Sequence, residues 1–273
     1  MSQIVLGTSR ISRLDQKHAN KIFDQANHLG INILDTAPSY GDSECKISLW
    51  KKQIDFNSNM RITTKLGVDE LKSTRELRKA LTRIHSLFKF EDIQTIFIHS
   101  IPLNQIGKKV FKELTSIRDA GEISQIGYSG DDDNLKQAIQ SGYFNAVMCT
   151  LNPIDNNNIK VLVDTQCNVD VYAKRVMANY AWTLQNQIRI KVLRRHNWVN
   201  TEYSRRLEKY FSTTPRNRVA DIFANYAMNS SYANYSVFGI SSLSHLNILF
   251  ERIEKNRNMA RLIFPIVSED SIT

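Results

Sequence analysis

Apolar and polar positions alternate along the chain between two kinds of segment. Short apolar runs, typical of strands buried on both faces, lie at residues 4–8, 31–35, 61–66, 93–99, 123–129, 146–151, 169–174 and 235–240. Between runs, apolar residues return at the spacing of one helix face, most clearly over residues 14–29, 73–88, 106–120 and 134–141. The pattern therefore predicts eight strands that alternate with helices.

Alternation of buried strands with helices predicts a parallel sheet of the α/β class. Gly30, Gly121 and Gly142 each follow a helical segment, where a left-handed residue ends a helix. Eight strand-helix units close naturally into a (β/α)8 TIM barrel, and an open doubly wound sheet is the alternative. The length of 273 residues suits one domain over residues 1–273. The long interval 178–234 predicts an inserted loop and two helices.

Composition excludes several classes of protein. No apolar run approaches the roughly 20 residues that cross a bilayer, and the N-terminus lacks a secretory signal, so we expect a cytoplasmic protein without a membrane partner. The cysteines Cys45, Cys149 and Cys167 are odd in number and lack CxxC spacing. We therefore expect free thiols and no metal site.

The net charge of +9 is compatible with a nucleic acid, a membrane surface or an anionic cofactor as partner. The densest basic segment has apolar residues interleaved, as in an amphipathic helix or a connecting segment with a solvated face; its basic residues are Arg189, Lys191, Arg194, Arg195 and His196. The chain has no combined aromatic and basic recognition motif, so no nucleic-acid partner is expected.

Ionisable residues end three consecutive strand runs. Asp35 ends the second run, Lys65 lies at the end of the third and His99 ends the fourth, while Tyr40 follows Asp35 in a loop. Active sites of such barrels lie at the carboxyl ends of the strands, so these side chains should meet on one rim. Singly, each also fits a structural role, as a helix-capping Asp, a surface Lys, a core His or a packed Tyr.

Several segments resemble the successive signatures of the aldo-keto reductases. They are DTAPSYGDSE at 35–44, TKLG at 64–67, IHS at 98–100, GEI at 121–123 and IGYS at 126–129, followed more loosely by GISS at 239–242. The resemblance implies a (β/α)8 fold, a nicotinamide cofactor bound across the barrel mouth, and reversible reduction of an aldehyde or ketone.

The chemistry of carbonyl reduction accounts for these residue types. Hydride addition places negative charge on the carbonyl oxygen, and Tyr40 would donate a proton to it. Lys65 would lower the phenol's pKa from its usual value near 10, and Asp35 would pair with that buried cation. His99 would orient the carbonyl and donate to the developing oxyanion.

The resemblance also implies a set of cofactor contacts. Ser129 would hold the nicotinamide amide, Lys174 and Arg175 would meet the diphosphate, and the turn into the last helix would offer free N–H groups to a phosphate. With Asn152 in the sixth strand region, the candidate cofactor residues are Ser129, Asn152, Lys174, Arg175, Gly239, Ser241, Ser242 and His245. An ordinary Ser helix cap is the alternative at the turn. The net positive charge favours NADP(H) over NAD(H).

The chain departs from the family's pattern at five positions. Gly130 stands where Asn is common, Met148 where many relatives have Gln, and His245 where an Arg commonly contacts the 2′-phosphate. Ile248 and Leu249 replace an acidic residue and an Asn. His245, Ile248 and Leu249 fall at the adenine end of the cofactor site, so weak or absent cofactor binding is the alternative there.

The C-terminal part after the last helix begins is short, with IFPIV at 263–267 as its apolar cluster. The pocket would then be open or completed by the segment 178–200, whose aromatic residues Tyr180, Trp182 and Trp198 could equally cover outer helices. We predict an NAD(P)(H)-dependent oxidoreductase for an aldehyde, ketone or sugar-like compound, or the matching alcohol, with Tyr40 as general acid/base. The alternative is a catalytically silent barrel that binds a nucleotide or a protein. The sequence does not indicate the oligomeric state.

Overall fold

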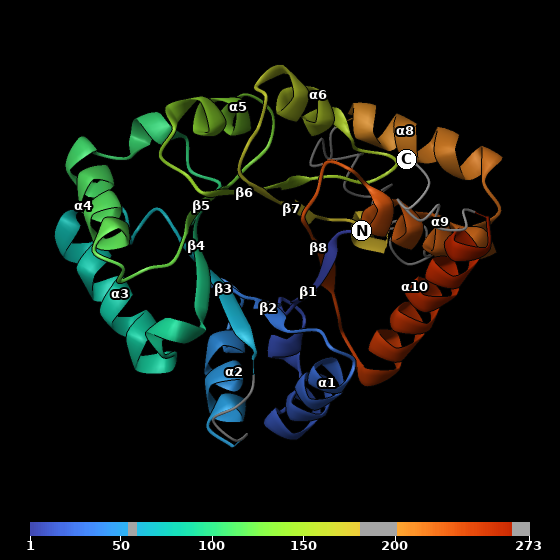
Figure 1. Ribbon diagram of the computed structural model, residues 1–273, viewed down its shortest axis with the longest axis horizontal. Helices are drawn as coiled ribbons and strands as arrows, with labels where there is room; N and C mark the ends of the chain where they lie inside the picture. The colour runs from blue at the N-terminus through green and yellow to red at the C-terminus, as the bar shows by residue number, and fades with distance from the viewer. Residues whose placement is uncertain (54–58, 181–200, 264–273) are drawn as a thin grey trace, which may run out of the picture.

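The computed structural model contains a closed barrel of eight parallel strands in the order of the chain. It describes residues 1–53, 59–180 and 201–263. Figure 1 shows the ring of strands surrounded by helices. The strands are β1 (Gln3–Gly7), β2 (Ile33–Asp35), β3 (Arg61–Leu66), β4 (Ile93–His99), β5 (Ile126–Ser129), β6 (Ala146–Thr150), β7 (Asp170–Lys174) and β8 (Tyr235–Gly239).

Helices form the outer layer around the strands, and two successive helices, α8 and α9, lie between β7 and β8 (Figure 1). The described α-helices are α1 (Gln16–His28), α2 (Ser43–Lys51), α3 (Thr74–Leu87), α4 (Lys108–Asp119), α5 (Asp132–Ser141), α6 (Asn157–Asp164), α8 (Thr201–Thr213), α9 (Arg216–Asn229) and α10 (Leu243–Ile263). Short 3₁₀ turns are η1 (Ile11–Arg13), η2 (Phe90–Asp92), η3 (Leu103–Gln105) and η4 (Ala178–Tyr180).

The predicted (β/α)8 barrel is confirmed. The open-sheet alternative is wrong because β1 pairs with β8 along its whole length, from Gln3 to Gly7. Helices α8 and α9 are the two helices expected within 178–234. Gly30, Gly121 and Gly142 all have positive φ, as their helix-ending role requires.

Some expectations lie outside the described residues. They are the basic segment 189–196, the side chains of Trp182 and Trp198, and residues 264–267 of the last apolar cluster. Extension of the single domain to residue 273 stays a prediction for the same reason.

The apolar pattern did not reveal α2 and α6. Helix α2 buries four polar side chains, those of Ser43, Glu44, Lys46 and Ser48, next to Ile47 and Trp50, and Leu49 is exposed. A helix whose inner face is largely polar has no clear apolar stripe. Helix α6 has only 8 residues, which is shorter than the window of about 11–18 residues over which helical periodicity is recognised.

The barrel interior is filled with side chains. Val5, Phe97, Met148 and Tyr172 belong to one buried cluster inside it. Gly127 is required opposite Phe97, because a Cβ at position 127 would lie 2.4 Å from the ring. A packed interior leaves ligands only the ends of the barrel.

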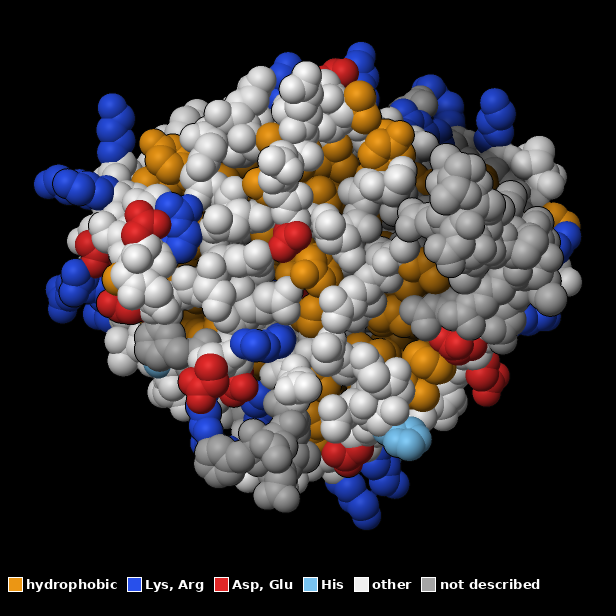
Figure 2. Space-filling view, viewed as in Figure 1, with side chains coloured by type: hydrophobic (Ala, Val, Ile, Leu, Met, Phe, Trp, Pro, Cys, Tyr) orange, Lys and Arg blue, Asp and Glu red, His pale blue; other side chains and the backbone are white. Residues whose placement is uncertain are grey.

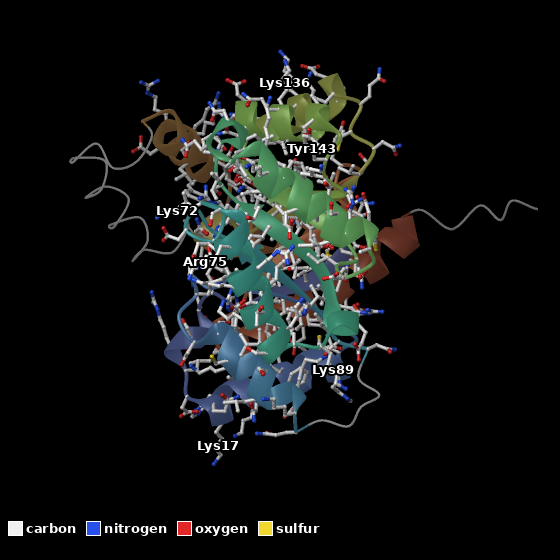
Figure 3. The ribbon with its side chains drawn as sticks, turned by 90° about the vertical axis from the view of Figure 1, so that its left-hand side faces the viewer. Lys17, Lys72, Arg75, Lys89, Lys136 and Tyr143 are labelled. Atoms are coloured by element: carbon white, nitrogen blue, oxygen red, sulfur yellow. The ribbon has the colours of Figure 1, made fainter. Side chains whose placement is uncertain are left out.

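The two ends of the barrel are well separated. In Figure 3, Lys72, which follows β3, lies at the left edge, and Lys89, which precedes β4, lies at the right. Figure 2 shows Lys and Arg side chains mostly around the periphery of this face, with few near its centre. No helix within the described ranges is both long and apolar enough to cross a membrane.

Candidate active site

The structure brings Asp35, Tyr40, Lys65 and His99 together. Asp35 ends β2, Lys65 lies at the carboxyl end of β3, and His99 ends β4, while Tyr40 lies in the loop before α2. All four line one cavity of about 260 Å³ at the carboxyl ends of the strands. The strands are parallel neighbours, and each residue lies near the carboxyl end of its strand. Asp35 pairs with Thr63 and Lys65 pairs with Phe97, so each successive residue lies two positions further along its strand.

Lys65 and Asp35 form a buried ion pair. Lys65 is 1% exposed, and its Nζ lies 2.7 Å from Asp35 Oδ1. The same Nζ donates to the carbonyl of Thr36 at 2.8 Å, and the Thr63 hydroxyl donates to Asp35 Oδ1 at 2.9 Å. These bonds fix the ammonium and compensate a charge that water does not reach.

The Tyr40 phenol lies beside this pair. Lys65 Nζ is 4.9 Å from the centroid of the ring, over its face. Burial raises the pKa of Tyr40 above its usual value, the charge of Asp35 raises it further, and Arg175 lowers it. The net shift is therefore upward, opposite to the lowering expected from Lys65, because desolvation of the phenol is the largest contribution and the charge of Asp35 adds to it.

The His99 ring meets Tyr40 edge to face, with ring centroids 6.4 Å apart. Burial lowers the pKa of His99 below its usual value, and the charges of Lys65 and Lys174 lower it further. The imidazole is therefore neutral at pH 7, with one N–H donor and one acceptor nitrogen.

Ser129 and Met148 line the same cavity. Ser129 is only 1% exposed, and its hydroxyl makes no hydrogen bond to any group in the described ranges. The Tyr128 ring accounts for the glycine at position 130, because a Cβ there would lie only 2.5 Å from that ring. The Tyr128 hydroxyl in turn donates to the carbonyl of Ile101 at 3.0 Å.

Lys174 and Arg175 also line the cavity, at the end of β7. Lys174 Nζ lies 3.1 Å from Asp131 Oδ2, so its charge is paired. Arg175 has a φ of 53°, a conformation that non-glycine residues seldom adopt. Asn152 does not line the cavity; its side chain donates to the Arg175 carbonyl at 3.1 Å and accepts two backbone N–H groups, so it shapes the loop that presents Arg175.

Gly239, the last residue of β8, lines the cavity, but residues 240–242 of the turn into α10 do not. The Ser242 hydroxyl accepts a hydrogen bond from the His245 N–H at 3.1 Å, which is the Ser helix cap considered as the alternative. His245 Nε2 lies 2.6 Å from the Tyr180 hydroxyl, and its Nδ1 lies 3.3 Å from Ser241 Oγ. Burial lowers the pKa of His245, and Arg10 lowers it further, so the ring is neutral.

Sequence reasoning missed Arg10, which lines the cavity from the loop after β1. The rule that found Asp35, Lys65 and His99 was an ionisable residue at the end of a strand run, and Arg10 lies two residues beyond the run 4–8. Tyr180, expected to complete the pocket or cover outer helices, lines the cavity. No cluster of His, Cys, Asp and Glu that could hold a metal occurs within the described ranges.

A larger hollow of about 640 Å³ lies at the opposite end of the barrel, among the segments that precede the strands. Its lining includes the side chains of Gln125, Asn145, Asp170 and Asn234. Several of these bond to one another or to the backbone, as Gln125 does to Asp170 at 2.9 Å. We place the candidate active site in the smaller cavity, where the four ionisable groups converge.

Comparison with known proteins agrees with this geometry. Residues 3–257 match the sequence model of the Aldo/keto reductase family. No curated protein matches the chain.

Several solved structures share the fold. A protein from Pseudomonas aeruginosa assigned to the aldo-keto reductases superposes with a TM-score of 0.69 at 18% identity, over 94% of this chain and 90% of that one. A protein assigned as a 2,5-diketo-D-gluconic acid reductase B gives 0.63 at 15% identity, over 94% and 86%. The glycerol dehydrogenase of Gluconobacter oxydans gives 0.65 at 15% identity, over 99% and 94%.

Proposed function

Because the chain belongs to the aldo/keto reductase family, we propose that it is a nicotinamide-dependent oxidoreductase. It reduces the carbonyl group of an aldehyde, ketone or sugar-like compound, or oxidises the matching alcohol. The observation that carries the proposal is the convergence of Asp35, Tyr40, Lys65 and His99 on one cavity.

The nicotinamide nucleotide, when bound, supplies the hydride that goes to the carbonyl carbon. Tyr40 donates the proton that the carbonyl oxygen needs, and its raised pKa keeps the phenol protonated at neutral pH. The neutral His99 ring offers an N–H to the same oxygen as negative charge develops there. Lys65, held by Asp35, lies over the phenol ring and stabilises the phenolate that proton donation leaves.

The residues around the cavity fit the nicotinamide end of such a nucleotide. Ser129 lines the cavity, and its hydroxyl makes no side-chain hydrogen bond in the described ranges, so it suits the carboxamide. Arg175 places positive charge at the end of β7 for the diphosphate, next to Lys174, whose ammonium is also bonded to Asp131. Asn152 acts by holding the Arg175 carbonyl.

The other end of the nucleotide would approach the turn formed by Gly239, Ser241 and Ser242, with His245 behind it. The N–H groups of Ser241 and Ser242 donate to no backbone carbonyl in the described ranges, and they precede a helix N-terminus that favours phosphate. We propose NADP(H) in preference to NAD(H), supported by the positively charged side chains around the cavity.

The test is a titration of the purified protein with NADPH and, separately, with NADH, followed by nucleotide fluorescence and by thermal unfolding. Tyr40→Phe is the matched variant, because it keeps the ring and removes the proton donor. Wild type and Tyr40→Phe should bind the nucleotide equally, and only the wild type should reduce carbonyl compounds in a substrate screen.

Two results would contradict the proposal. If the wild type bound neither nucleotide, the chain would be the catalytically silent barrel instead. If Tyr40→Phe turned over substrate as fast as the wild type, the phenol would not be the proton donor. The cytoplasmic location and the absence of nucleic-acid and membrane partners stay predictions.

A further inference from the structure

Arg10 is a positively charged residue of the cavity to which no role has yet been given. It follows β1 and precedes the turn η1, so it approaches the cavity from the side of β1. Its guanidinium carbon lies 5.5 Å from the centroid of the Tyr180 ring, a cation-π contact that holds the half-buried side chain at the rim. Tyr180 in turn lies against His245, at the start of α10.

The charge of Arg10 has no acidic partner in the described part of the chain. Lys65 is paired with Asp35, and Lys174 is paired with Asp131. Arg10 takes part in no ion pair there, although it lines the cavity. A guanidinium that is held in place without a carboxylate is ready to bind an anion, and its planar array of donors matches a phosphate.

The positions of the charged groups separate two ends of the site. The charge of Arg175 lowers the pKa of the Tyr40 phenol, so Arg175 lies near the place where the reacting atoms would be. The charge of Arg10 instead lowers the pKa of Tyr180 and of His245, so Arg10 lies toward the turn into α10. His245 cannot supply positive charge at that turn while it is neutral and both of its ring nitrogens lie against hydroxyl groups.

We propose that Arg10, rather than His245, is the cation that binds a phosphate group of the nicotinamide nucleotide at the rim between β1 and α10. The inference rests on the proposed function and adds a binding residue to it. Two phosphates of the nucleotide share the required chemistry, the 2′-phosphate and the 5′-diphosphate. The choice between them also decides whether Arg10 sets the preference for NADP(H).

The experiment compares Arg10→Met with the wild type by isothermal titration calorimetry. Methionine keeps an apolar stem against Tyr180 and removes the charge. The ligands are NADPH, NADH, adenosine 2′,5′-bisphosphate and ADP. Arg13→Ala is the matched control, since Arg13 lies exposed in the same turn and does not line the cavity. Arg10→Lys tests whether charge alone restores binding.

Loss of one charge-assisted contact to phosphate should raise Kd by about 10- to 100-fold in Arg10→Met. The effect should shrink at high salt, and Arg10→Lys should recover part of the binding, which a purely structural role would not produce. Arg13→Ala should bind like the wild type. Weakening of NADPH and the 2′,5′-bisphosphate alone identifies the 2′-phosphate, and equal weakening of NADH and ADP identifies the diphosphate.

Unchanged affinity of Arg10→Met for all four ligands would overturn the inference while leaving the proposed function intact. Failure of the wild type to bind either dinucleotide would instead remove the proposed function. In that case, loss of binding of the phosphate fragments in Arg10→Met would still support a phosphate site at Arg10, and absence of any fragment binding by the wild type would overturn it. Thermal unfolding of each variant without ligand shows whether it is folded.

Discussion

Asp35→Ala tests how the buried charges of the site are stabilised. The substitution removes the carboxylate that lies 2.7 Å from Lys65 Nζ and that also accepts a hydrogen bond from the Thr63 hydroxyl. Lys65 is 1% exposed, so the ammonium has little contact with water to compensate for the lost partner. The ammonium would keep only the Thr36 carbonyl, at 2.8 Å.

Removal of one partner from a buried ion pair lowers the free energy of unfolding by about 3–5 kcal/mol. Most of this loss comes from the charge left behind rather than from the contact itself. The double variant that combines Asp35→Ala with Lys65→Met leaves neither charge of the pair, and Met fills a volume similar to that of Lys. We therefore expect the double variant to be more stable than Asp35→Ala alone, and closer to the wild type.

The assay is urea unfolding followed by circular dichroism at neutral pH, with comparison of the free energies extrapolated to water. Glu76→Ala is the control, because its ion pair with Lys79 is exposed and should contribute little. A double variant less stable than Asp35→Ala would refute the reasoning, since the remaining charge would not then be the main source of the loss. An Asp35→Ala variant as stable as the wild type would refute it as well.

Three further predictions concern pH and packing. Burial raises the pKa of Tyr172, and raises the pKa of Tyr128 to about 12. Phenols of the unfolded chain ionise near pH ~10, so the free energy of unfolding should fall as pH rises above that value. Absorbance at 295 nm should then show fewer tyrosinates in the folded protein than in urea. The pKa of His99 is lowered, so protonation of His99 in the folded protein is unfavourable and should lower the free energy of unfolding as pH falls below about 6.5. Urea unfolding at each pH should show that His99→Gln loses less stability than the wild type over that range. Gly130→Ala should cost about 1–3 kcal/mol in the same assay, because its Cβ would lie 2.5 Å from the Tyr128 ring, whereas Gly107→Ala has open space and should be tolerated.

The sequence determined the architecture to a large extent. The runs at 61–66 and 93–99 coincide with β3 and β4, and the helical segment 73–88 differs from α3 by one residue at each end. Strands buried on both faces and helices with one apolar face leave strong periodic signals, because burial dictates the residue type at each position. The same strand ends disclosed Asp35, Lys65 and His99 as candidates.

Elements whose burial depends on polar contacts escaped the sequence pattern. Helix α2 packs through Glu44, which accepts a hydrogen bond from the Thr64 hydroxyl at 2.6 Å and forms an ion pair with Arg83. Such contacts join residues far apart in the chain, and no local periodicity records them. Only the folded barrel shows that a buried carboxylate belongs there.

The tertiary structure also decided the state of the site. The sequence names Tyr40 and Lys65 as neighbours, but the sign of the effect on the phenol depends on burial and on the distance to Asp35, so the pKa is raised rather than lowered. The sequence pattern did not single out Arg10, which lies after the first strand. The pairing of β1 with β8 places it at the rim of the cavity. Electrostatic effects act through space and through desolvation, and both are set by the fold rather than by position along the chain.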